Sequence, residues 1–121
     1  MVQPVERRRF IRKNIRMPCS LAKPSGMMFS GNTKDVSLEG VLMESMAFMG
    51  GACPVSIGDS GLLTLRFKMD GKEDSIKVRC LIAHISSNGV GIRIRTNDMI
   101  KKDQDKLGQI IAVGRPQIET G

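Results

Sequence analysis

The sequence predicts a mainly all-β domain, a small six-stranded antiparallel β-barrel followed by one C-terminal α-helix. Over most of residues 15–94, apolar residues alternate with polar ones, which is the period of half-buried strands. Asp70-Gly71 and Asn88-Gly89 separate such runs, and both dipeptides favour tight hairpin turns. After Arg95 the apolar spacing becomes that of a helix. Closing the sheet would remove its exposed edges, so a barrel is expected.

Two stretches predict the first strands. One strand is expected over residues 15–21, where Pro18 indicates either a sheet edge or a strand that starts at a bend. A second strand is expected within residues 27–36, with an interruption near Gly31 and Asn32.

The remaining strands follow a sharper pattern. A third strand is expected around residues 41–43. The runs at 63–69 and 76–82 flank the Asp-Gly turn and predict a hairpin, and residues 90–94 predict the last strand. The chain therefore holds about six strands joined mostly by short turns, which favours antiparallel pairing.

A helix is predicted over residues 96–113. Four apolar residues share one helical face: Ile100, Leu107, Ile110 and Ile111. The end signals are Thr96 or Asn97 as the N-cap, Asp98 in the first turn, and Gly114 with Pro116 after the last turn.

The length of 121 residues suits one domain. We divide it into an arginine-rich arm (1–14), a barrel (15–95), a helix (96–113) and a tail (114–121). The arm is expected to be flexible, because it is polar and cationic without a core-forming period.

Positive charge is concentrated near the start of the chain. The formal net charge is +7, and the basic residues of this stretch are Arg7, Arg8, Arg9, Arg12, Lys13 and Arg16. A basic balance favours an anionic partner such as nucleic acid, an anionic membrane or a phosphate ligand. Composition alone is equally consistent with a solvated tail.

Little in the sequence indicates catalysis, a metal or a cofactor. Cys19, Cys53 and Cys80 form no CxxC pair, so buried reduced thiols are expected. His84 is the only histidine, which leaves no Cys/His or Ser/His pair with independent support. We expect neither an enzyme nor a metal site, and no apolar run is long enough to cross a bilayer.

Two short motifs are present, one before the first predicted strand and one running from the end of the second predicted strand to just before the third. Residues 7–12 contain RRxxxR, and residues 35–40 match DxSxxG. With these two motifs in this order and a small all-β pattern, the chain resembles the PilZ domain family over roughly residues 5–112. The similarity is looser at residues 55–58 and 89–92. The resemblance implies a bacterial cytoplasmic domain that binds the messenger cyclic di-GMP.

The resemblance also implies which residues bind the ligand. They are Arg7, Arg8, Arg12, Asp35, Ser37 and Gly40, with Arg9 and Arg16 as further candidates because residues 12–16 form a second RxxxR. Arg8 and Arg12 are expected to contact phosphate and guanine. The planar arginine fork matches a phosphate and the O6/N7 edge of guanine bidentately, which fits this ligand independently.

The leading hypothesis is a receptor module. The arm folds over the ligand against residues 35–40, and the changed surface alters affinity for a downstream protein partner. A secondary hypothesis is a stacked pair of ligand molecules, supported by Arg7 and Arg9. One alternative is a barrel that binds nucleic acid non-specifically, which the absence of Trp and Tyr disfavours. The other is a PilZ-like scaffold without a ligand.

Overall fold

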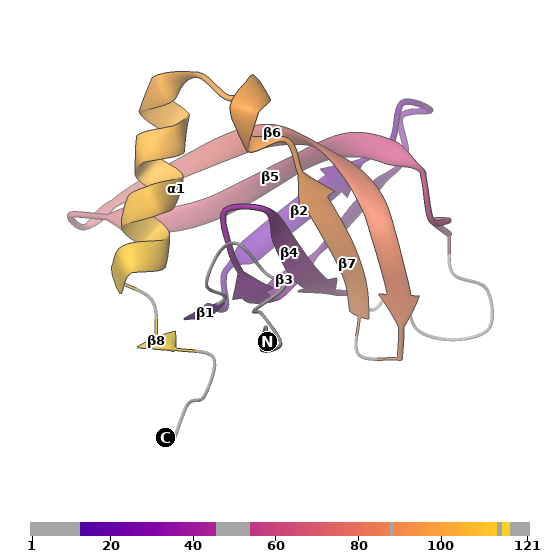
Figure 1. Cartoon of the computed structure of the whole chain (residues 1–121), viewed down its shortest axis with the longest axis horizontal. Helices are drawn as coiled ribbons and strands as arrows, with labels where there is room; N and C mark the ends of the chain where they lie inside the picture. Colours follow the sequence, from indigo (N-terminus) through magenta and orange to yellow (C-terminus); the bar gives the residue numbers. More distant parts are fainter. Residues whose placement is uncertain (1–12, 46–53, 88, 114, 117–121) are drawn as a thin grey trace, which may run out of the picture.

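The computed structural model describes residues 13–45, 54–87, 89–113 and 115–116 (Figure 1). The elements in chain order are β1 (Lys13–Asn14), β2 (Pro18–Ala22), β3 (Met28–Val36), β4 (Gly40–Glu44), β5 (Ser60–Met69), β6 (Lys72–Ser86), β7 (Gly89–Ile94), the 3₁₀ helix η2 (Thr96–Asp98), α1 (Lys101–Val113) and β8 (Arg115–Pro116). None of the helices in these ranges is long and apolar enough to span a bilayer.

Six of the strands close into a barrel, as predicted. Their order around the sheet is β2-β5-β6-β7-β4-β3, and β3 pairs back with β2 to complete the ring. Every pairing within the ring is antiparallel. The two-residue strands β1 and β8 extend the sheet from β3.

The core lies inside the ring and is built from the inward residues of each alternating strand. Aliphatic and sulfur-containing side chains fill it, and the least exposed include Leu21, Val36, Val41, Met43, Leu63, Leu65, Ile76 and Val90. Cys19 and Cys80 are buried free thiols in this cluster, as expected; Cys53 lies outside the described residues. This burial supplies most of the driving force for folding.

Two strand predictions are refined by the structure. The first strand begins at Pro18, which corresponds to the predicted start at a bend. The predicted interruption near Gly31 and Asn32 is wrong, because β3 runs continuously through both residues. Glycine is needed there for close approach instead, since a Cβ at Gly31 would lie 2.1 Å from the carbonyl oxygen of Glu44.

The helix begins later than predicted. Thr96–Asp98 form a separate 3₁₀ turn. The backbone of Met99 is extended (φ −82°, ψ 149°), so it interrupts the helical conformation between this turn and α1. The amide of Gln104 donates to the carbonyls of Thr96 and Met99, both at 3.0 Å, which stabilises this break. Met99 is buried where Ile100 was expected, and Ile100 is exposed.

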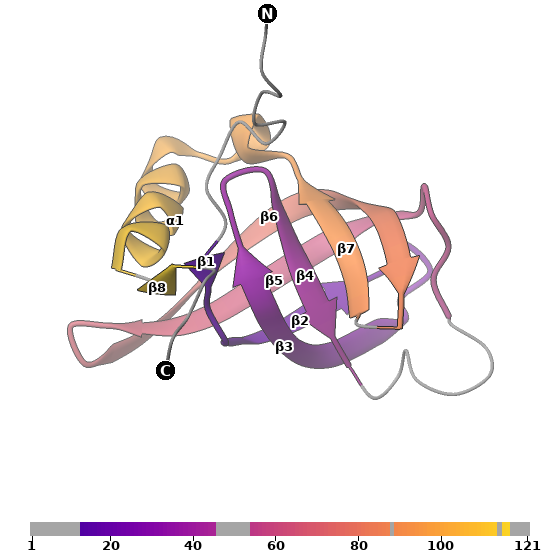
Figure 2. The ribbon, with the colours of Figure 1, turned by 60° about the horizontal axis from the view of Figure 1, so that its bottom comes forward.

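The C-terminal helix packs beside the long β5–β6 hairpin at one end of the barrel (Figures 1 and 2). Leu107 and Ile110 are buried on the face that was predicted, with Ile111 half-buried beside them. An ion pair joins the Nζ atom of Lys106 on α1 to Oδ2 of Asp74 on β6 at 3.0 Å.

Candidate functional site

The turn between β3 and β4 is shaped by the hydroxyl group of Ser37. The side chain is fully buried, and its oxygen accepts hydrogen bonds from the N–H groups of Glu39 (3.2 Å) and Gly40 (3.1 Å). The hydroxyl donates to the carbonyl oxygen of Gly40 at 3.3 Å, and the Ser37 N–H donates to the same oxygen at 2.8 Å. The Ser37 side chain is therefore engaged within its own turn.

Contacts from the end of the barrel hold the same turn in place. The N–H of Ile94 donates to the carbonyl of Glu39 at 3.1 Å, and the hydroxyl of Thr96 donates to the carbonyl of Leu38. A Cβ at Gly40 would lie 2.8 Å from the carbonyl oxygen of Ile92. Strand β4 can pass this close to β7 only because residue 40 is glycine.

Asp35 lies at a β-bulge on β3. The register against β4 shifts between Thr33 and Asp35, so that Lys34 is the extra residue. Asp35 pairs with Leu42, and across the next strands Leu42 pairs with Gly91 and Gly91 with His84. Paired residues share a face of the sheet, so these four residues form one row on the outward side of the barrel, in which Asp35 is buried and His84 is exposed.

A hollow of about 360 Å³ lies beside this row. Its lining includes Gly40, Leu42, His84, Gly91 and Arg93, whereas Asp35 does not line it. Arg93 is exposed and pairs with Gly40 across β4 and β7. Figure 2 shows β3, β4 and β7 side by side on this surface. We call it the glycine face, and its residues are Asp35, Gly40, Leu42, His84, Gly91 and Arg93.

Sequence reasoning did not include His84 or Arg93 in the site. Both come from strands far along the chain, and only the closed barrel brings them next to residues 35–40. The available signal was Gly91, because a glycine inside a strand often marks a place where another group approaches the backbone closely.

The described chain begins at Lys13, directly after the arginine motif in the sequence. Arg7, Arg8, Arg9 and Arg12 lie outside the described residues. The next residue, Lys13, pairs in β1 with Val36, the neighbour of Asp35 on β3. Adjacent strands are about 4.8 Å apart, so Lys13, which directly follows the motif in the sequence, lies within a few ångströms of Val36.

Arg16 is engaged in an ion pair. Its Nη1 atom lies 2.5 Å from Oε1 of Glu44, and both side chains are at least partly exposed. Glu44 ends β4, and Gly40 begins the same strand. Arg16 therefore lies at the opposite end of β4 from the serine-held turn.

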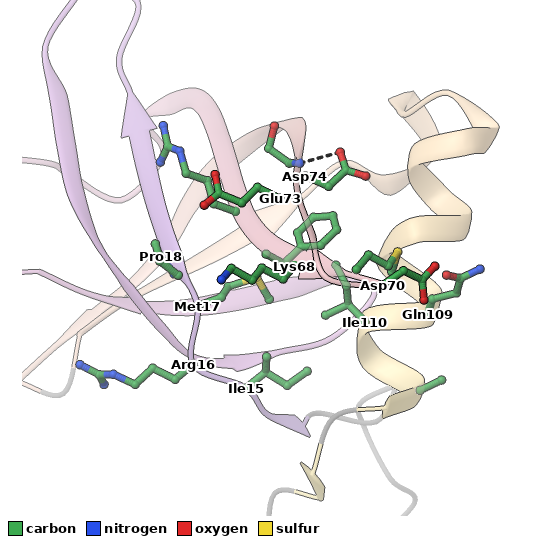
Figure 3. A pocket seen from close by; sticks show the side chains of 15 residues that line it. Ile15, Arg16, Met17, Pro18, Lys68, Asp70, Glu73, Asp74, Gln109 and Ile110 are labelled. Carbon is green, nitrogen blue, oxygen red and sulfur yellow. Dashed lines mark hydrogen bonds between the residues drawn. The ribbon is translucent and has the colours of Figure 1, made fainter.

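A larger hollow than the one on the glycine face lies elsewhere. Its volume is about 1140 Å³, and it separates the β5–β6 hairpin from α1 (Figure 3). Met17 and Ile110 face it from opposite sides, and Lys68, Asp70 and Glu73 lie along the hairpin. None of the glycine-face residues lines it.

The two described thiols are suited to packing. Burial raises the pKa of Cys19 to about 12, against a smaller opposing effect of the positive charge of Arg66. Burial raises the pKa of Cys80 to about 11. Both thiols are therefore protonated and unreactive at neutral pH. Within the described ranges, no group of three or more His, Cys, Asp and Glu residues is arranged to hold a metal ion.

The fold and the glycine face define the class of this protein as a small closed β-barrel module with a C-terminal helix. The PilZ domain model matches residues 6–112, and the chain therefore belongs to the PilZ family. PilZ domains are generally non-catalytic binding modules, and the family includes receptors for cyclic di-GMP. No curated protein matches the chain.

Solved structures show the same fold at low sequence identity. The inhibitor of motility MotI/DgrA of Bacillus subtilis matches with a TM-score of 0.71 and 14% identity over 89% of this chain. The match spans only 50% of that protein. The PilZ domain of YcgR from Escherichia coli, solved with c-di-GMP, matches with a TM-score of 0.65 and 16% identity, covering 88% of this chain and 90% of that one. The PilZ domain of CeSA from a cellulose-synthesizing bacterium has a TM-score of 0.56 and 16% identity, covering 84% and 94%.

Proposed function

We propose that this chain is a receptor for cyclic di-GMP in the bacterial cytoplasm, and that the ligand binds on the glycine face beneath the N-terminal arginines. The observation that carries the proposal is the pairing of Lys13 with Val36. Lys13 directly follows the RxxxR motif in the sequence and Val36 belongs to the DxSxxG segment, so this pairing supports a site that uses both motifs. The two motifs, separated by more than twenty residues in the sequence, can therefore act on one ligand.

The chemistry of the glycine face fits a guanine base. The Asp35 carboxylate accepts hydrogen bonds when ionised, and the Watson–Crick edge of guanine presents N–H donors. Asp35 is buried and already interacts within the protein, so in this proposal the base replaces that contact. Gly91 is partly exposed and carries no side chain, so a flat base can approach its backbone beside His84. Gly40 is buried against the carbonyl of Ile92 and allows β4 to pack close to β7. Ser37 contributes by holding the turn, because its hydroxyl is engaged there.

The arginines supply the complementary charge. In this proposal Arg8 and Arg12 bind phosphate and the O6/N7 edge of guanine, and Arg7 adds a further cation. Arg93 extends from the other side of the hollow and can contact a second phosphate. Arg7 and Arg9 would also provide charge for a stacked pair of ligand molecules, and the fitted stoichiometry decides between one ligand and two.

The proposed mechanism is an ordering switch. Closure of the arm over the ligand changes the exposed surface near β1 and β3, and a downstream protein partner recognises the changed surface. The chain itself performs no chemistry on the ligand. Its output is a difference in partner affinity between the free and the bound states.

Isothermal titration calorimetry with cyclic di-GMP tests the site. Arg8→Ala and Arg12→Ala should each cost about 1–3 kcal/mol, which is roughly 5- to 150-fold in affinity. Asp35→Asn should weaken binding in the same direction, because half of the carboxylate acceptor is replaced by a donor. Arg79→Ala is the matched control, since Arg79 is exposed on β6, away from the glycine face.

Other outcomes distinguish the alternatives. Wild-type affinity in both arginine variants would remove the site assignment. Binding of RNA or DNA with a steep salt dependence, without a response to cyclic di-GMP, would instead favour the nucleic-acid barrel. If neither cyclic di-GMP nor nucleic acid binds even at high concentration, the interaction scaffold is favoured.

A further inference from the structure

The outer surface around β2 and β5, with the adjoining ends of β3 and β6, lies on the opposite side of the barrel from β4 and β7 of the glycine face. The ring order β2-β5-β6-β7-β4-β3 puts the β2–β5 pair across from the β7–β4 pair. Anything bound at β2 and β5 therefore leaves the glycine face open, and this surface can be argued and tested independently of the proposed ligand.

One end of this opposite surface is apolar and exposed. Five large hydrophobic side chains of the described residues are exposed, and four are at this end: Met27 (51%), Met28 (63%), Ile57 (67%) and Leu62 (38%). Exposed hydrophobic side chains that are scattered singly over a surface are normal, but here four of the five are clustered at one end.

The pairing explains why these four side chains are neighbours. Ala22 pairs with both Met28 and Leu62, so the two long side chains flank a small one in a single row. The Nζ atom of Lys23 donates to the carbonyl of Pro54 at 3.2 Å and lies 3.5 Å from Oδ2 of Asp59, which joins the β2–β3 turn to the loop that carries Ile57. Figures 1 and 2 both show this turn and this loop at the same end of the barrel.

Cations border the apolar end. Arg79 pairs with Leu62, and Lys77 pairs with Thr64 in the next row along the hairpin. Arg66 follows on β5 and donates to the hydroxyl of Ser20 at 3.4 Å. Within the described part of the chain, none of these three cations makes an ion pair, so their charge is available to an outside partner.

A hollow on this surface is lined both by Leu62 of the apolar end and by Arg79, one of the cations that border it. Its volume is about 620 Å³, and its lining includes Leu62 and Leu81 together with Lys23, Arg79 and Arg95. Lys23 and Arg95 are ion-paired with Asp59 and Asp98, which leaves Arg79 for an outside anion. An apolar wall next to such a cation suits an amphipathic anion, because the acyl side can contact the leucines while the phosphate meets Arg79.

We propose that this surface docks peripherally on an anionic phospholipid bilayer. Met27, Met28 and Ile57 insert at the level of the headgroups, and Arg79 and Lys77 meet the lipid phosphates. A bilayer fits better than a nucleic acid because base stacking needs exposed aromatic rings. The chain has no Trp or Tyr, and the described phenylalanines are buried (Phe29) or half-buried (Phe67).

Co-sedimentation of the full chain with vesicles tests this docking. Binding is expected to vesicles of phosphatidylcholine mixed with phosphatidylserine, and not to vesicles of phosphatidylcholine alone. Lys77→Glu/Arg79→Glu should lower the partition coefficient by about 30-fold or more, because each cation near an anionic surface contributes about 1 kcal/mol. Met28→Ser/Ile57→Ser should lower it by about tenfold or more through lost apolar burial.

Two control variants match these changes elsewhere on the molecule. Lys101→Glu/Lys102→Glu alters the net charge equally on exposed α1 residues, and Ile100→Ser removes a side chain that is 64% exposed at the start of that helix. Both controls should bind as the wild type does. Equal loss in the controls, equal binding to uncharged vesicles, or preferential binding of single-stranded RNA over vesicles would each overturn the proposal.

Discussion

The β3–β4 turn and the β5–β6 turn both reverse the chain between antiparallel strands, but different forces hold them. At the β5–β6 tip, Asp70 (φ 53°) and Gly71 (φ 78°) adopt left-handed backbone conformations, and a Cβ at Gly71 would meet nothing within 4 Å. The β3–β4 turn is held by the Ser37 hydroxyl and by contacts from Ile94 and Thr96. The β5–β6 turn depends on local backbone conformation, whereas the β3–β4 turn combines the local hydrogen bonds of Ser37 with contacts from elsewhere in the closed barrel.

Because of this difference, we expect the β3–β4 turn to be the stiffer of the two, and stiffness suits a binding surface. The β3–β4 turn is held by contacts from Ile94 and Thr96 as well as by Ser37, so Gly40 is held in position before any ligand arrives. Preorganisation of this kind lowers the entropic cost of binding. The β5–β6 tip has no such neighbours and can vary without disturbing the glycine face.

The largest effect is expected for Gly40→Ala. The added Cβ would lie 2.8 Å from a backbone carbonyl, so β4 and β7 must separate, at the upper end of about 1–3 kcal/mol in unfolding free energy. Urea denaturation measures the loss, and affinity for cyclic di-GMP should fall with it. Gly108→Ala is the control: a Cβ there meets nothing within 4 Å, and in a helix it should stabilise by about 0.5–1 kcal/mol.

Ser37→Ala should have the next largest effect. The variant leaves the N–H groups of Glu39 and Gly40 without their acceptor in a buried turn, which costs about 1–2 kcal/mol of unfolding free energy. Ser75→Ala, at an exposed serine on β6, should change the same denaturation curve little. Equal stability of the two variants would mean that the hydroxyl of Ser37 does not hold the turn.

Gly71→Ala should cost less, about 1 kcal/mol, because only a left-handed backbone conformation is penalised. Binding of cyclic di-GMP should be unchanged, since the tip is remote from the glycine face. Calorimetry on this variant therefore sharpens the comparison between the two turns. A loss of affinity comparable to that of Gly40→Ala would contradict it.

The smallest effect is expected for Asp74→Asn, also in the β5–β6 hairpin. The hydrogen bond from Lys106 and then the one from the Ser75 N–H hold the pKa of Asp74 below its usual value. The ionised carboxylate therefore stabilises the fold above its unfolded-state pKa, and this contribution is lost as the pH falls through the folded-state pKa. Thermal melts should show a slightly less stable variant at neutral pH and no difference in strong acid.

The parts of the fold that follow local rules could be predicted from the sequence. Alternation located β5, β6 and β7, and the Asp70-Gly71 turn lies where it was expected. The last apolar residues of α1 also pack as predicted. Their physical causes, side-chain period and turn conformation, act within a few residues of the chain.

Other features depend on contacts between residues far apart in the sequence and could not be predicted from it. The bulge before Asp35 and a second register shift between Ile82 and His84 become defined only when β3 meets β4 and β6 meets β7. The late start of α1 reflects burial of Met99, which needs a neighbouring surface. For the same reason, the sequence motifs indicated Asp35 and Gly40 but not the adjoining His84 and Arg93.

An amide NMR titration of the wild-type chain with cyclic di-GMP tests the central claim most directly. The account predicts shifts concentrated at residues 35–40, at Gly91 and Arg93, and in the RxxxR segment, with residues 77–79 on the opposite surface unchanged. A spectrum that stays unperturbed at high ligand concentration, or shifts confined to the opposite surface, would contradict it.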